Sequence, residues 1–169
     1  MNLGLLTPEL TLAAVAIIVI LLDLIVPRKG WLAVVSIAGI VAAAGFTIAL
    51  WGGDSQLIFN NMLAVDNFAL FFKLLFLAIA ALVILASTDY VSKFARFQGE
   101  YYALVLLSAL GMMLMAATTE LISIYIALEL TSISLYVLVG FLKDPKSTEA
   151  SLKYLLLGAI ASAVLLFGM

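Results

Sequence analysis

The chain alternates between long apolar runs and short polar connections. Six runs each hold about 20 mostly apolar residues, the length that an α-helix needs to cross the hydrocarbon core of a membrane. The predicted spans cover residues 8–26, 31–51, 66–87, 101–117, 121–142 and 148–169. The pattern therefore predicts an all-α polytopic membrane protein with about six transmembrane helices.

The fourth and fifth spans are separated by very little polar sequence. From Tyr101 to Leu142 the chain is almost continuously apolar, and one helix over this range would be about 63 Å long, about twice the hydrocarbon thickness. Three consecutive polar residues, Thr118, Thr119 and Glu120, interrupt this apolar range, so a tight turn is predicted there. The connection over residues 54–65 is predicted to be irregular and that over residues 88–100 to be a charged loop.

The composition supports the membrane class and excludes several kinds of site. Of the residues, 66% are hydrophobic and 11% are charged, whereas soluble domains have about 45–50% and about 25%. The net charge of −2 is too small to indicate binding to nucleic acid. Since the chain has no cysteine or histidine, disulfides, iron–sulfur ligation and histidine-ligated metal or haem are excluded within it.

Basic residues lie in alternate connections, which predicts an orientation. The connections after the first, third and fifth spans contain Arg28, Lys29, Lys93, Arg96, Lys143 and Lys146. The connections after the second and fourth spans contain no lysine or arginine. The positive-inside rule puts the basic connections in the cytoplasm, so the N-terminus is expected on the outer, periplasmic side of the cell membrane.

A carboxylate lies in the middle of the fifth span. Glu129 would be costly to place in lipid, and such a group usually faces a protein or water-filled interior and marks an ion or proton path. Tyr125, Ser132 and Tyr136 share its helical face. These groups can satisfy a carboxyl in either protonation state and can order a water chain. The alternative is a protonated Glu129 that only holds helices together.

Two lysines inside the predicted spans have competing interpretations. Lys153 is either on a proton path or an interfacial anchor that pairs with Glu149, four residues earlier on the same face. Lys73, roughly 10 Å inside the third span, either snorkels to the interface, makes a structural pair or belongs to a proton path. Gly158 and Ser162 form a small-xxx-small pair, which predicts the close approach of a neighbouring helix.

Two sequence segments carry a recognisable pattern. ELTSISLYVLVGF from Glu129, and STEASLKY followed by LLFGM, resemble the fifth and sixth helices of the antiporter-like subunits of complex I, the proton-pumping NADH:quinone oxidoreductase. VDNFALFF at residues 65–72 resembles the start of their third helix. The related L- and M-type subunits and the Mrp-type antiporters usually have tryptophan where this chain has Leu128, which favours the N-type subunits.

The resemblance implies roles for particular residues. Glu129 matches the family's fifth-helix glutamate, which pairs with a lysine on a broken seventh helix, and Lys153 matches the sixth-helix lysine of the EAxxKY motif. Quinone reduction elsewhere in the complex would then drive proton movement through such charged pairs. NADH, FMN, iron–sulfur clusters and quinone would be bound by other subunits, and the partners would be other membrane subunits and the lipid bilayer.

The resemblance also implies that the chain is incomplete. The family's subunit contains a second, inverted repeat, which normally closes a site at the membrane midplane. The chain is therefore expected to be an N-terminal fragment that forms the first part of an antiporter-like helical bundle. Two other functions stay open: a subunit of an Mrp-type cation/proton antiporter, and a non-catalytic membrane scaffold.

Overall fold

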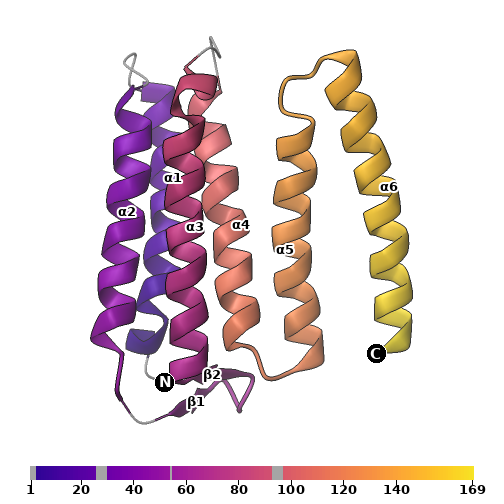
Figure 1. The fold of residues 1–169 in the computed structure, drawn as a ribbon. Coiled ribbons are helices and arrows are strands. Elements are labelled where there is room, and N and C mark those ends of the chain that lie inside the picture. The colour runs from indigo at the N-terminus through magenta and orange to yellow at the C-terminus, as the bar shows by residue number, and fades with distance from the viewer. Residues whose placement is uncertain (1–2, 26–29, 54, 93–96) are drawn as a thin grey trace.

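The chain is a bundle of long helices that run up and down in turn (Figure 1). The computed structural model describes residues 3–25, 30–53, 55–92 and 97–169. Its long helices are α1 (Thr7–Ile25), α2 (Gly30–Ala49), α3 (Asn67–Val91), α4 (Gln98–Ala117), α5 (Leu121–Val139) and α6 (Pro145–Gly168). Within the described residues, these six are long and apolar enough to cross a membrane. The predicted fold class, a multi-pass helical membrane protein, is confirmed.

The buried core lies among α1, α2, α3 and α4. α1 packs against α2 and α4, and α3 also packs against α2 and α4, so α1 and α3 face each other across the centre of this four-helix bundle. The core includes Leu12, Ala16, Val19, Ile40, Ala43, Leu77, Ile84, Leu106, Ala109 and Met113. α5 packs on the outside of α4, and α6 in turn packs on α5 (Figure 1). The two C-terminal helices therefore extend from one side of the bundle.

A glycine sets the distance between α4 and α5. A Cβ added to Gly111 would lie 2.8 Å from the carbonyl oxygen of Ala127 and 2.9 Å from the backbone nitrogen of Thr131. The Thr131 hydroxyl donates hydrogen bonds to the carbonyl of Ala127 in its own helix and, at 3.3 Å, to that of Ser108 in α4. The two backbones are thus in direct contact, as is common between transmembrane helices with small residues at their interface.

The connection between α2 and α3 contains a β-hairpin, whereas the hydrophobic pattern predicts an irregular segment there. β1 (Gln56–Ile58) pairs antiparallel with β2 (Leu63–Val65). Residues 59–61 between them have positive φ angles, which asparagine tolerates better than most residues. The backbone nitrogen of Thr119 donates to the carbonyl of Met62 at 3.0 Å, so the hairpin is tied to the turn between α4 and α5.

The helix bounds differ from the predicted spans around the charged loop and around the turn between α5 and α6, where α5 ends at Val139 rather than residue 142. α3 ends at Val91 rather than near Ser87, and α4 begins at Gln98 rather than Tyr101. The last turn of α3 contains the exposed Asp89. A span predicted from hydropathy ends near the first charged residue. The helix itself continues for as long as its backbone hydrogen bonds do, which here is beyond the apolar part.

A capping residue sets the start of α6. The Asp144 carboxylate accepts a hydrogen bond from the backbone nitrogen of Ser147 at 2.6 Å, and Pro145 occupies the first helical position. α6 therefore begins three residues before the predicted residue 148. The hydrogen bond from the Ser147 amide is the largest effect holding the pKa of Asp144 below its usual range.

We expect Asp144→Ala to loosen the first turn of α6, because the Ser147 amide would lose its acceptor. In the natural chain this stabilisation should be complete above the ordinary carboxyl pKa of about 4 and be lost as the pH falls through the lowered pKa of folded Asp144. Hydrogen exchange of the Ser147 amide, relative to its intrinsic rate at each pH, measures both effects. Asp144→Asn, which keeps an acceptor, is the control. Equal exchange in the alanine variant and the natural chain would contradict this role.

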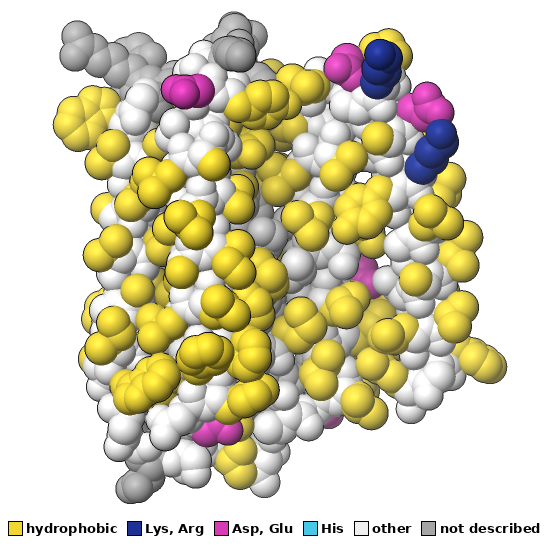
Figure 2. All heavy atoms as spheres, viewed as in Figure 1, with side chains coloured by type: hydrophobic (Ala, Val, Ile, Leu, Met, Phe, Trp, Pro, Cys, Tyr) yellow, Lys and Arg dark blue, Asp and Glu magenta, His cyan; other side chains and the backbone are white. Residues whose placement is uncertain are grey.

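The outer surface agrees with a membrane location. The face in Figure 2 is covered by apolar side chains along most of the helices, and the Lys and Arg side chains visible on it gather at the start of α6. Lys143 and Lys146 belong to this end of the molecule. The other basic residues that the orientation prediction uses, Arg28, Lys29, Lys93 and Arg96, lie outside the described residues.

Candidate functional site

Glu129 lies near the middle of α5 and faces another helix. It is the ninth of the 19 residues of α5, which begins at Leu121. Its side chain is half-buried, and its carboxylate oxygen Oε1 accepts a hydrogen bond from the hydroxyl of Ser162 in α6. A serine hydroxyl can donate to a carboxylate and can also accept from a protonated carboxyl. The contact can therefore persist in both protonation states of Glu129.

Small and aromatic residues hold α6 beside this carboxylate. The buried ring of Tyr136 in α5 packs edge-on against that of Tyr154, with the centroids 4.7 Å apart. A Cβ on Gly158 would lie 2.6 Å from Cζ of Tyr136, so the ring occupies the space that this glycine leaves. The hydroxyl of Ser151 donates to the carbonyl of Tyr136 at 2.8 Å. The helix approach predicted from Gly158 and Ser162 is therefore confirmed, with α5 as the neighbour.

The other members of the predicted polar stripe do not bond to Glu129. Tyr125 and Ser132 are half-buried on α5, and in the described part of the chain no hydrogen bond joins either of them to the carboxylate. Tyr136 packs against α6 instead. The sequence predicts Ser162 as a packing residue only. Its contact with Glu129 depends on how α5 and α6 are rotated relative to each other, which the sequence pattern does not show.

Lys153 and Glu129 are not brought together. The ammonium of Lys153 lies 2.6 Å from the carboxylate of Glu149, and these side chains are 70% and 65% exposed. Ser162, which contacts Glu129, is nine residues further along α6, about 14 Å at 1.5 Å per residue. Within the described residues, Lys153 thus makes the local pair that was one of its two predicted interpretations.

Of the predicted alternatives for Lys73, the structure shows a structural pair and not snorkelling to the interface. The side chain of Lys73 is completely buried, and its Nζ lies 2.5 Å from Oε1 of Glu9, which is 4% exposed. The partner was missed because a glutamate in the first turn of a helix is ordinarily explained by the helix dipole. One feature of the sequence could have predicted the pair. α1 and α3 begin at the same end of the bundle, and each has one charged residue within its first two turns.

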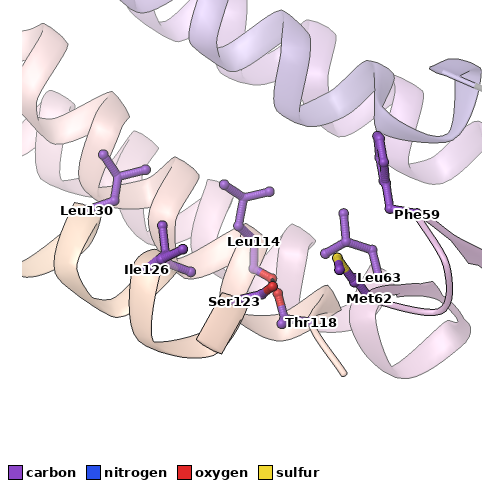
Figure 3. Close-up of a pocket in the computed structure, with 9 residues that line it drawn as sticks. Phe59, Met62, Leu63, Leu114, Thr118, Ser123, Ile126 and Leu130 are labelled. Carbon is purple, nitrogen blue, oxygen red and sulfur yellow. Dashed lines mark hydrogen bonds between the residues drawn. The ribbon is translucent and has the colours of Figure 1, made fainter. Parts of the chain in front are cut away.

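A separate apolar cavity lies between the hairpin and helices α4 and α5 (Figure 3). It measures about 270 Å³ and is lined by Phe59, Met62 and Leu63 from the hairpin region and by Leu114, Ile126 and Leu130 from α4 and α5. The hydroxyls of Thr118 and Ser123 also reach it, but both are hydrogen-bonded to the protein. The cavity suits hydrocarbon rather than ions. Among the residues that the structure describes, no acidic cluster could hold a metal ion.

One family description matches the C-terminal part of the chain. Residues 118–169 match the transmembrane family of the NADH:quinone oxidoreductases and Mrp antiporters. This segment contains α5 and α6, and therefore both Glu129 and Lys153.

Curated relatives match almost the whole chain. NADH-quinone oxidoreductase subunit N of Dehalococcoides mccartyi is 53% identical over 163 residues, which are 96% of this chain and 34% of the relative. The subunit N of Trichlorobacter lovleyi is 45% identical over 171 residues, covering 99% of this chain and 35% of the relative. The chain thus spans about a third of the length of these relatives.

Solved structures show the same arrangement of helices. A chain of respiratory complex I from Thermus thermophilus has a TM-score of 0.78 and 33% identity over 96% of this chain and 35% of its own length. A chain of an archaeal membrane-bound sulfane sulfur reductase, at 23% identity, shares the fold with a TM-score of 0.82 over 99% of this chain and 36% of its own. Both curated relatives are named as NADH-quinone oxidoreductase subunits, whereas the family description also includes Mrp antiporters. The predicted resemblance to the antiporter-like N subunits of NADH:quinone oxidoreductase is thereby confirmed, for a chain that spans about a third of their length.

Proposed function

We propose that the chain is part of a membrane subunit of NADH:quinone oxidoreductase that takes part in proton translocation coupled to quinone reduction. The observation that carries this proposal is Glu129, a carboxylate midway along a transmembrane helix that faces a second helix within the family-matched segment. Intramembrane ionisable groups that face a protein interior commonly mark proton relays.

Glu129 is the proposed proton carrier, and the groups near it support that role. The hydroxyl of Ser162 can bond either form of the carboxyl, which keeps the side chain in place while it gains or loses a proton. Tyr125, Ser132 and Tyr136 are proposed to order water along the same helix.

Lys153 is the second proposed proton-transfer group. Its present partner, Glu149, is exposed with it on α6, so a buried charge from outside this chain could compete for the ammonium. An exposed pair of this kind contributes at most about 1 kcal/mol to stability, so an exchange of Glu149 for another partner would require little free energy.

The remaining partners follow from the same proposal. NADH, FMN, the iron–sulfur clusters and quinone would be bound by other subunits of the complex. No residue of α6 is buried, and its apolar surface is available to lipid or to other membrane segments. The orientation proposed from the basic residues has the N-terminus on the periplasmic side and Lys143 and Lys146 in the cytoplasm.

Replacement of Glu129 by glutamine in the full-length subunit tests the function. In the intact complex, proton pumping and coupled quinone reduction should fall by about tenfold or more, because the amide cannot carry the proton. Glu100→Gln, the same substitution at an exposed position of α4, is the matched control and should keep full activity. An assembled Glu129→Gln complex with normal pumping would refute the role. A change in stability without a change in ion movement would support the scaffold alternative.

A further inference from the structure

Glu9 and Lys73 meet inside the four-helix bundle, far along the chain from Glu129. Glu9 lies in the first turn of α1 and Lys73 in the second turn of α3. Because α1 and α3 each pack against α2 and α4, the two side chains reach toward each other across the bundle. Their contact of 2.5 Å between Oε1 and Nζ is enclosed, since the side chains are 4% and 0% exposed.

Within the described residues, each charge has only the other to compensate it. Both carboxylate oxygens of Glu9 and the Nζ of Lys73 are buried without any hydrogen bond of good geometry. α2 contains no ionisable residue. The other ionisable residues of α1, α3 and α4 lie at the opposite end of these helices: Asp23, Asp89, Tyr90, Glu100, Tyr101 and Tyr102. The acidic groups at the same end have other partners: Asp66 accepts from the amide of Ala69, and Glu120 accepts from the hydroxyl of Ser123.

Helix packing alone does not require this pair. On α1, the side chain of Val15 fills the space beside Gly39 of α2, and Gly99 of α4 approaches the backbone oxygen of Val19. α1 is therefore fixed by close contacts that involve neither Glu9 nor Lys73. A well-packed apolar pair of similar volume is often as stable as a buried ion pair or more stable, so a contribution to stability does not by itself explain these charges.

We propose that Glu9 and Lys73 form a second proton-binding site in this chain. Transfer of one proton from the Lys73 ammonium to the Glu9 carboxylate gives a carboxylic acid and a neutral amine, with no change in net charge. The transfer removes two charges that the bundle interior solvates poorly, and it needs no movement beyond the existing contact. The site then holds one transferable proton that the two side chains share.

The existence of this site does not depend on the proposed function, although the use of its proton does.

Infrared difference spectra between two pH values, recorded on the intact complex with the full-length subunit in lipid vesicles, detect protonated carboxyl groups directly. Glu9→Gln/Lys73→Gln is the test variant, because it removes both charges and leaves neither group buried alone. Glu129→Gln is the matched control, since it removes a carboxyl of the other proposed site.

We expect a carboxyl band that changes with pH and shifts in heavy water, that is lost in the double variant and that persists in Glu129→Gln. Thermal unfolding should show that the double variant is folded. A spectrum of the folded double variant identical to that of the natural protein would overturn the proposal and leave the pair as a static contact. If pumping survives in Glu129→Gln while the Glu9 band still titrates, the proposed function fails and the proton-binding site stands.

Discussion

Lys73→Met should destabilise the bundle by about 3–5 kcal/mol, the usual cost of removing one partner of a buried ion pair. Methionine fills much of the volume of the lysine stem but cannot compensate the Glu9 carboxylate, which is 4% exposed and has no other partner within the described residues. The free energy of unfolding, measured by denaturant titration in mixed micelles, gives the size of the effect.

Two further variants make this prediction specific. Lys146→Met is the same substitution at an exposed position and should change the stability by no more than about 0.5 kcal/mol. Adding Glu9→Gln to Lys73→Met should restore most of the loss, because the uncompensated charge is then gone. If Lys73→Met were as stable as Lys146→Met, the buried contact in the bundle would not exist as described.

Gly111→Ala should destabilise the packing of α5 on α4 by about 1–3 kcal/mol, the range for an overpacked interface. The added methyl group would lie less than 3 Å from backbone atoms of Ala127 and Thr131, which cannot move away as a flexible side chain can. The two helices must therefore separate, and the hydrogen bond from Thr131 to the Ser108 carbonyl would lengthen.

Gly45→Ala is the matched control for this substitution. Gly45 is an exposed helical glycine of α2 with nothing within 4 Å of an added Cβ. Alanine there should stabilise the chain by about 0.5–1 kcal/mol, because glycine loses more backbone freedom in a helix. The two variants should thus have opposite signs in the same unfolding assay, and equal effects would argue against backbone contact at Gly111.

The membrane fold follows from the sequence because span length and hydropathy depend on local composition. The turn at residues 118–120 lies at the three consecutive polar residues that predict it. A turn is required in this region because one continuous helix would be far longer than the membrane is thick. The hairpin over residues 56–65 has strands of three residues, too short for a period-two pattern, and its attachment to Thr119 is a contact between distant segments. Pattern analysis cannot detect either feature.

The candidate site is predictable only where a single residue carries the signal. Glu129 stands out because a lone carboxylate in an apolar run has few explanations. Ser162 and Glu9 do not stand out, since a serine in a small-residue pair and a glutamate in a first helical turn both have ordinary local explanations. Their partners depend on how the helices are rotated and which corners of the bundle they occupy, and hydropathy contains no information about either.

The position of Glu129 along α5 has an electrical consequence. A unit charge that crosses the whole membrane gains or loses about 2.3 kcal/mol per 100 mV of transmembrane potential. Because Glu129 is the ninth of 19 residues in its helix, a proton reaching it from either surface crosses close to half of that potential, about 1.2 kcal/mol per 100 mV. Under the proposed function, a rise in membrane voltage would oppose the loading and the release of this proton by nearly equal amounts.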